Sequence, residues 1–351
     1  MSRFLLRPLT LLLALLLPVV AAHAEDLPAT IRFGGVGAGY GLPFGTSLIA
    51  IAHVKGFVAD QFKGTPVKLQ WNYFTNTGPA INEAFANQQL DFAQYGVLPQ
   101  IIARANGVQT RLLLSGGGSH IYAAARSNLP IHSIADLKGH TVTLQKATIL
   151  HWALLETLAA HGLSGKDVTI LDLKGPDQLA ALAAGSVDAT FGTTNLLTLR
   201  DKGVVRIFYE SAKDPKAVWP ESLLVSADFE KRYPGATERV VRGFVEAAYW
   251  LAQPQNHDEA IRIWAKSGLP EALLVKDFAG DDFKNRFTPL LDPFVLDRFR
   301  KGIAFARDQR LIRHDVDINQ WVDGHYLDAA LKASGHEGFW HPRGLSGLAS
   351  N

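Results

Sequence analysis

The chain has 351 residues, with 35 basic and 33 acidic side chains and no cysteine. This length is sufficient for about two domains, and a core of that size does not depend on disulfides. The balanced charge and the lack of an Arg/Lys-rich stripe argue against a nucleic-acid-binding surface.

The first 24 residues have the pattern of a secretory signal peptide. Arg3 and Arg7 give a positive start, an apolar run covers residues 9–20, and Ala22-His23-Ala24 matches a small-residue cleavage site. An N-terminal anchor helix is the alternative reading, but the run is short for a helix that spans a membrane. No cysteine follows it to carry a lipid. We therefore expect cleavage at the end of segment 1–24, a neutral mature chain because both arginines are removed, and a periplasmic location.

An approximate internal repeat divides the rest of the chain. Residues 72–96 read NYFTNTGPAINEAFANQQLDFAQYG, and residues 171–192 read LDLKGPDQLAALAAGSVDATFG. Aligning Gly78 with Gly175 places Asp91 on Asp188 without a gap, and each copy reads as strand, Gly-Pro turn, helix and strand. Because both aspartates precede strands at equivalent positions, we expect them to have a structural role.

The repeat extends upstream and predicts the fold class. Segment 31–37 matches 141–147, so each half reads β-loop-α-β-α-β and builds a mainly parallel sheet flanked by helices. The chain then crosses between halves within 112–131 and returns within 206–229. We predict an α/β fold with two hinge crossings. The predicted parts are lobe one, residues 25–118 and 222–351, and lobe two, residues 119–221.

In such sheets the ligand crevice lies beyond the carboxyl ends of the strands. Residues 141–152, TVTLQKATILHW, read as a strand that runs directly into a helix, which places free backbone N–H groups at that edge. Helix N-termini attract anions, and Thr148 is a suitable capping residue. The Gly35–Pro43 loop and the turn at Gly96-Val97 are the corresponding positions in lobe one.

Several motifs, in this order and spacing, resemble the substrate-binding proteins of ABC importers in the nitrate/sulfonate/taurine group. They are IRFG, TGPAINEAFANQQLDFAQYGVLP, IHSIADLKGHTVTLQKAT, HGLSGKDV and LAAGSVDA. The resemblance covers the mature chain and implies a two-lobed type II periplasmic-binding fold. It also implies that the protein closes on a small-molecule solute and docks to a membrane permease. We expect a monomer that uses no cofactor and no metal.

The candidate ligand-binding residues combine the loops above with polar and aromatic side chains near them. They are Gly37, Tyr40, Gly41, Gly96, Val97, Gln145, Ala147, Thr148, His151, Thr193, Thr194, Asn195 and Trp219. Trp152 continues the apolar stripe of its helix, so we expect it in the core. For His151 a half-buried place in the helix is the alternative, and Arg286 is read as an ion-pair partner of Asp281 or Asp282 or as an anchor for an anion.

The chain departs from the family pattern in ways that bear on the solute. Val97 stands where sulfonate binders often carry an acid, and Thr193-Thr194-Asn195 replaces a Trp-Asp-Pro-like triplet. These differences favour a sulfonate-like anion over a taurine-like solute. Aromatic or heterocyclic acids, a vitamin precursor and a sensor ectodomain remain alternatives.

Other kinds of site have weaker support. The glycine-rich segment 34–41 does not keep the dinucleotide-binding spacing, and no acid ends the following strand. The histidines show no metal-site spacing. An enzyme on the same fold is the remaining alternative, but the pyrimidine-synthesising relatives depend on a cysteine-rich motif that a chain without cysteine cannot have.

Overall fold

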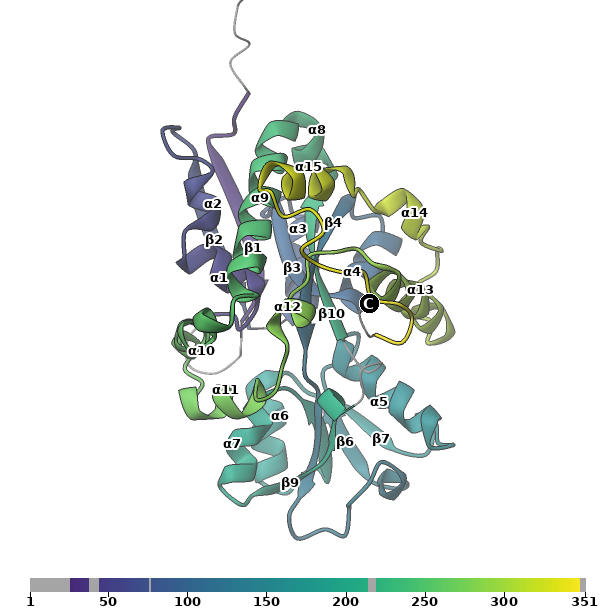
Figure 1. Ribbon diagram of the computed structural model, residues 1–351. Coiled ribbons are helices and arrows are strands. Elements are labelled where there is room, and N and C mark those ends of the chain that lie inside the picture. The colour runs from purple at the N-terminus through teal and green to yellow at the C-terminus, as the bar shows by residue number, and fades with distance from the viewer. Residues whose placement is uncertain (1–25, 38–43, 76, 214–218, 348–351) are drawn as a thin grey trace, which may run out of the picture.

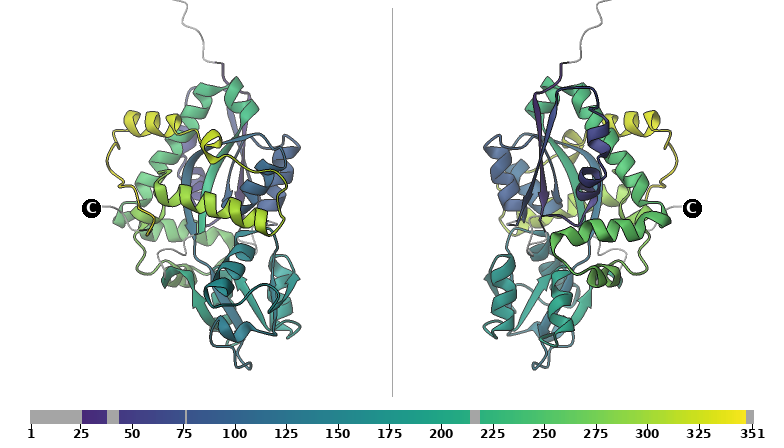
Figure 2. Two further views of the ribbon diagram at one scale, coloured as in Figure 1. Left: turned by 90° about the vertical axis from the view of Figure 1, so that its right-hand side faces the viewer. Right: turned by 90° about the vertical axis from the view of Figure 1, so that its left-hand side faces the viewer.

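The computed structural model describes residues 26–37, 44–75, 77–213 and 219–347. They form two five-stranded sheets, each covered by helices, that lie one beyond the other in every view (Figure 1) (Figure 2). The first sheet has the order β2-β1-β3-β10-β4, with β1 Thr30–Val36, β2 Lys68–Phe74, β3 Phe92–Gly96, β4 Thr110–Ser119 and β10 Trp219–Ser226. The second has the order β7-β6-β8-β5-β9, with β5 Tyr122–Arg126, β6 Thr141–Leu144, β7 Thr169–Asp172, β8 Ala189–Gly192 and β9 Val205–Glu210.

The two sheets repeat one topology. In each, four strands run in one direction, and the fifth, β10 or β5, runs antiparallel to both of its neighbours. Asp91 accepts a hydrogen bond from the backbone N–H of Arg32 at 2.8 Å, and Asp188 accepts the matching bond from Thr141 at 3.0 Å. Both aspartates therefore have the structural role that the repeat predicts. The upstream alignment was one residue out of register, because Arg32, and not its neighbour Ile31, is equivalent to Thr141.

A helix follows each of three parallel strands in either lobe, β1, β2 and β3 in lobe one and β6, β7 and β8 in lobe two. In lobe one these are α1 Leu48–Val54, which α2 Phe57–Asp60 follows, α3 Thr77–Ala86 and α4 Val97–Ala105. In lobe two they are α5 Ile149–Ala160, α6 Gly175–Ala183 and α7 Asn195–Asp201. Because each helix starts beyond the carboxyl end of its strand, the six N-termini point toward the region between the sheets.

The chain after β10 is helical. It forms α8 Ala227–Arg232, α9 Pro234–Leu251, α10 His257–Trp264, α11 Glu271–Asp277, α12 Phe283–Arg286, α13 Pro293–Asp308, α14 Ile318–Trp321 and α15 His325–Ala333. Short 3-10 turns occupy Ala135–Leu137, Ser211–Lys213, Pro254–Asn256 and Ala265–Ser267. Helix α9 packs with α1, α2 and α15, and α13 packs on α4. Among the described ranges, no helix has both the length and the apolar character needed to cross a bilayer.

The crossings between the sheets lie close to their predicted places. Strand β4 ends at Ser119 and β5 begins at Tyr122, while the return joins Glu210 of β9 to Trp219 of β10. The return strand thus begins before the predicted boundary at residue 222. One segment of 222–351 also packs on the other lobe, because Leu273 of α11 belongs to a buried cluster with residues of β5, α6 and α7.

Candidate functional site

A cavity of about 160 Å³ lies between the two sheets. All six helices that follow the parallel strands contribute their first residues or the residue before them to its lining. These residues are Ser47, Thr77, Gly78, Gly96, Thr148, Ile149, Leu150, Gly175, Thr194 and Asn195. Each helix N-terminus carries a partial positive charge and unpaired N–H groups, so their convergence favours an anion.

The turn before α5 shows how the sequence builds this edge. Ala147 has φ +60°, a left-handed conformation that turns the chain from β6 into the helix. Thr148 then caps α5, since its Oγ1 accepts a hydrogen bond from the N–H of Leu150 at 3.2 Å. The side chain of Gln145 reaches across the cavity, where its Oε1 accepts a bond from the Thr77 hydroxyl at 3.1 Å.

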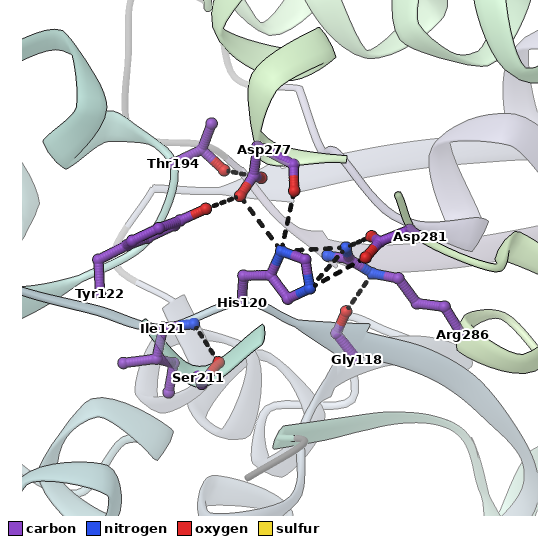
Figure 3. A network of polar contacts seen from close by, with 9 residues as sticks. All are labelled: Gly118, His120, Ile121, Tyr122, Thr194, Ser211, Asp277, Asp281 and Arg286. Carbon is purple, nitrogen blue, oxygen red and sulfur yellow. Dashed lines mark hydrogen bonds and ion pairs between the residues drawn. The ribbon is translucent and has the colours of Figure 1, made fainter. Parts of the chain in front are cut away.

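A charged cluster forms one wall of the cavity (Figure 3). Asp277, at the end of α11, accepts hydrogen bonds from the Thr194 hydroxyl at 2.6 Å, from the Tyr122 hydroxyl and from His120 Nδ1 at 3.3 Å. Burial raises the pKa of Asp277, but the bond from His120, the charge of Arg286 and the two hydroxyl bonds outweigh it and hold that pKa below its usual value. Because Thr194 and Tyr122 belong to lobe two, Asp277 joins α11 to that lobe.

Arg286 belongs to the same wall. Its guanidinium pairs with Asp281, donates to the carbonyl of Gly118 at 3.1 Å, and lies 4.3 Å from the ring of Phe278. The predicted ion pair with Asp281 is therefore present, and Arg286 also lines the cavity. The guanidinium of Arg286 is therefore paired with the Asp281 carboxylate and also lies at the cavity.

The floor of the cavity carries a buried carboxyl group. Glu221 of β10 is 9% exposed and accepts hydrogen bonds from Gln94 Nε2 at 3.0 Å and Ser119 Oγ at 2.9 Å. Burial raises the pKa of Glu221, and the bonds from Ser119 and Gln94 and the charge of Arg286 offset this only in part.

The structure brings most of the predicted ligand-binding residues to this cavity. Gly37, Gly96, Gln145, Thr148, Thr193, Thr194 and Asn195 all line it. Val97 and Ala147 adjoin lining residues but are not part of the lining themselves. Tyr40 and Gly41 lie outside the described residues.

Two predicted residues pack elsewhere. Trp219 is 1% exposed and lies edge to face on Trp152, with ring centroids 5.1 Å apart, so it belongs to the core and not to the cavity wall. His151 points into the same region, where its ring packs edge-on to Phe305 at 6.0 Å. Burial lowers the pKa of His151, as expected for an imidazole held among aromatic side chains.

Sequence reasoning named Thr194 and Arg286 of the charged wall but missed its other cavity-lining members and the floor of the cavity. His120, Glu221 and Asp277 come from three separate segments and join only in the folded chain. The crossing predicted within residues 112–131 includes Ser115–Ser119, which the structure places in β4. Within the described residues, no group of three His, Cys, Asp or Glu side chains is arranged to hold a metal ion.

Comparison with known proteins identifies the family. The model of the NMT1-like family matches residues 36–265, which span most of both lobes. The chain belongs to the NMT1-like family. This finding, together with the relatives below, confirms the predicted resemblance to solute-binding proteins of ABC importers and the two-lobed α/β type II fold.

The chain is similar over most of its length to proteins named for sulfonates. It is 26% identical over 300 residues to an aliphatic sulfonates-binding protein of Bacillus subtilis (strain 168), covering 83% of this chain and 87% of the relative. It also matches the structure of the periplasmic sulfonate-binding protein SsuA of Methylobacillus flagellatus KT. That match has 28% identity, a TM-score of 0.79, and coverage of 92% of this chain and 99% of the other.

Two more distant structures share the fold of this NMT1-like protein. The alkanesulfonate-binding protein SsuA of Xanthomonas axonopodis pv. citri, bound to MOPS, matches with 23% identity and a TM-score of 0.71, covering 86% of this chain and 99% of the other. The desulfurization enzyme DSZB matches with 19% identity and a TM-score of 0.68, covering 87% and 99%. The fold therefore occurs in binding proteins and in at least one enzyme. A choice between a binding role and a catalytic role has to be argued from the residues of the site.

Proposed function

We propose that this protein is the solute-binding component of an ABC importer and captures a sulfonate-like organic anion between its lobes. The observation that carries the proposal is the convergence of six helix N-termini on one cavity. Backbone N–H groups hold a sulfonate strongly and reversibly through hydrogen bonds, since no covalent bond has to form or break. The relatives named for sulfonates, and the neighbour bound to the sulfonate MOPS, support this class of solute.

The proposed site contains Gly37, Gly96, Gln145, Thr148, Thr193, Thr194 and Asn195, together with His120, Glu221 and Arg286, which line the same cavity. Closure of the two lobes over the solute would present the closed form to a membrane permease. Export to the periplasm through cleavage of the first 24 residues belongs to the same proposal, and the similar SsuA of Methylobacillus flagellatus KT is named as a periplasmic protein. N-terminal sequencing of protein recovered from the periplasm should begin at Glu25.

The test of this function compares charged and neutral solutes of one shape. Ethanesulfonate should raise the melting temperature and give a binding isotherm, because a ligand that binds only the folded state stabilises it. Ethanesulfonamide is a close neutral match and should give neither effect. Equal binding of the two compounds would contradict an anion site. The same conclusion would follow if neither these compounds nor longer alkanesulfonates bound.

A non-catalytic role is part of the proposal. The enzyme DSZB has a cysteine that was replaced by serine in one solved mutant. This chain has no cysteine, so it cannot use that residue type for catalysis. We expect the sulfonate to be recovered unchanged after long incubation, as measured by mass spectrometry. A mass change that depends on the folded protein would support an enzyme instead.

An aromatic sulfonate or carboxylate is the second candidate. Phe278 and Phe287 line the cavity beside Arg286, and such rings pack well on a flat solute. Benzenesulfonate should then bind more tightly than ethanesulfonate. The reverse order would restrict the site to short aliphatic anions.

A further inference from the structure

Glu221 differs from the other carboxylates of the cavity wall. It stands on β10 directly opposite Gly96 of β3 and Gly117 of β4, so its direct partners on both strands carry no side chain. Gly116 and Gly118 also line the cavity at this point. The glycines leave the buried carboxyl group as the floor on which a solute would rest.

The groups that hydrogen-bond to Glu221 are neutral. Gln94 on β3 and Ser119 on β4 donate to it, and Arg286, whose charge acts on it, is already paired with Asp281. Burial in this setting disfavours a charged carboxylate, and the pKa of Glu221 is raised.

The other titratable groups around the site come from neighbouring elements. His120 follows β4, Tyr95 lies on β3, and Asp277 ends α11. Burial raises the pKa of Tyr95, which keeps its phenol neutral, so it cannot supply a charge that changes near neutral pH. His120 bonds to Asp277 and lines the same cavity, so a variant of His120 is needed as a control.

We infer that Glu221 binds the solute as a neutral carboxyl group, so that capture of an anion takes up one proton from the solvent wherever Glu221 is ionised in the free protein. This inference rests on the proposed function, since only an anionic solute creates the effect. A carboxylate would repel the sulfonate, whereas the protonated group donates an O–H to a sulfonate oxygen. By linkage, if protonation of Glu221 raises the affinity for the anion, then bound anion raises the affinity of Glu221 for the proton.

The pH dependence of binding follows with a definite sign. A sulfonate keeps its charge across the whole accessible range, so any slope comes from the protein. Once the pH exceeds the value at which Glu221 ionises in the free protein, the Kd should rise, by up to about tenfold per pH unit for one linked proton. Below that value the Kd should be constant.

The experiment is calorimetric titration of ethanesulfonate between pH 5 and 8 in buffers of different ionisation enthalpy, which counts the protons taken up. Glu221→Gln keeps an N–H donor but cannot titrate, so its Kd should be independent of pH and within about threefold of the wild-type value at low pH. Glu221→Ala lacks the donor and should bind about tenfold more weakly at low pH, also without a slope. Glu83→Gln removes an exposed carboxylate of α3 and is the matched control, which should keep the wild-type slope.

Each outcome decides the inference. Proton uptake in wild type and Glu83→Gln, absent from Glu221→Gln, would support it. A slope that persists in Glu221→Gln and vanishes in His120→Asn would overturn it in favour of the histidine. Binding with no proton uptake at a pH where Glu221 is ionised in the free protein would overturn this inference alone, as would loss of binding in Glu221→Gln with an unchanged melting temperature. Failure of every alkanesulfonate to bind wild-type protein would overturn the proposed function and this inference with it.

Discussion

Trp152 of α5 meets Trp219 of β10 edge to face, and this pair joins lobe two to the first sheet beside the return crossing. Arg298 of α13 covers both rings, with its guanidinium 4.3 Å from one and 4.6 Å from the other. It also forms two hydrogen bonds to Glu156 of α5, at 3.0 and 3.1 Å. The two lobes are therefore connected by packed side chains as well as by the chain crossings.

Truncation of this contact should destabilise the protein. Trp152→Ala removes a buried ring and should lower the free energy of unfolding by about 3–5 kcal/mol, because a cavity replaces the ring. Urea unfolding measures the change. Trp152→Phe keeps an aromatic ring and should cost clearly less, so equal losses in the two variants would contradict a packing role.

Substitution of Gly96 tests whether this structure has the closed arrangement of the two lobes. A Cβ at this position would lie 2.7 Å from Cγ2 of Ile149, which belongs to the opposite lobe. Gly96→Ala should therefore obstruct closure and weaken binding of ethanesulfonate by about tenfold to a hundredfold, the range expected for 1–3 kcal/mol of overpacking. Titration calorimetry provides the measurement.

The matched rescue is Gly96→Ala combined with Ile149→Ala. Trimming the isoleucine should recover most of the lost affinity, because it removes the atom that the new methyl group meets. If the double variant binds no better than Gly96→Ala, the loss has another cause than contact between the lobes.

The bond between Thr194 and Asp277 should couple the lobes energetically. Asp277→Ala leaves the buried hydroxyls of Thr194 and Tyr122 without their acceptor, at a cost of about 1–3 kcal/mol in unfolding free energy. A double-mutant cycle with Thr194→Val, measured by urea unfolding, should give a coupling of about 0.5–3 kcal/mol. Strictly additive effects would show that this contact contributes nothing of its own.

The sequence predicts well what depends on local pattern and repeat. Asp91 and Asp188 are matched by sequence because each follows its Gly-Pro pair at the same spacing and directly precedes a strand. Thr148 caps α5 because its residue type suits that position. Charged residues such as Asp277 escape this reasoning, since α11 reaches lobe two only through tertiary packing.

Trp219 illustrates a different difficulty. The following Pro220 reads as loop punctuation, because proline cannot donate to a strand ladder. In the fold, β3 pairs with β10 only from Glu221 onward, so Pro220 lies beyond the end of that neighbour. The proline therefore begins a central strand without loss of a hydrogen bond to β3, and Trp219 is buried with it.

Asp188 should make the stability of lobe two depend on pH in the acid range. It accepts hydrogen bonds from the Thr141 N–H at 3.0 Å, Arg126 at 2.9 Å and His140 at 3.1 Å. Burial raises the pKa of Asp188, but these bonds outweigh it and hold the pKa below its usual value. A carboxylate whose pKa is lowered by folding contributes stability above its unfolded pKa of about 3.9, and that contribution is lost as the pH falls through the folded value.

Asp188→Asn should therefore cost most near neutral pH. We expect a loss of about 1–3 kcal/mol in unfolding free energy at pH 7, since the hydrogen bonds to a charged acceptor are weakened, and a smaller loss at pH 3. Urea unfolding of wild type and variant at both pH values measures the difference. Asp315→Asn, which changes an exposed carboxylate, should show little effect at either pH. A loss for Asp188→Asn that is the same at pH 3 and pH 7 would mean that the charge of this carboxylate does not support the fold.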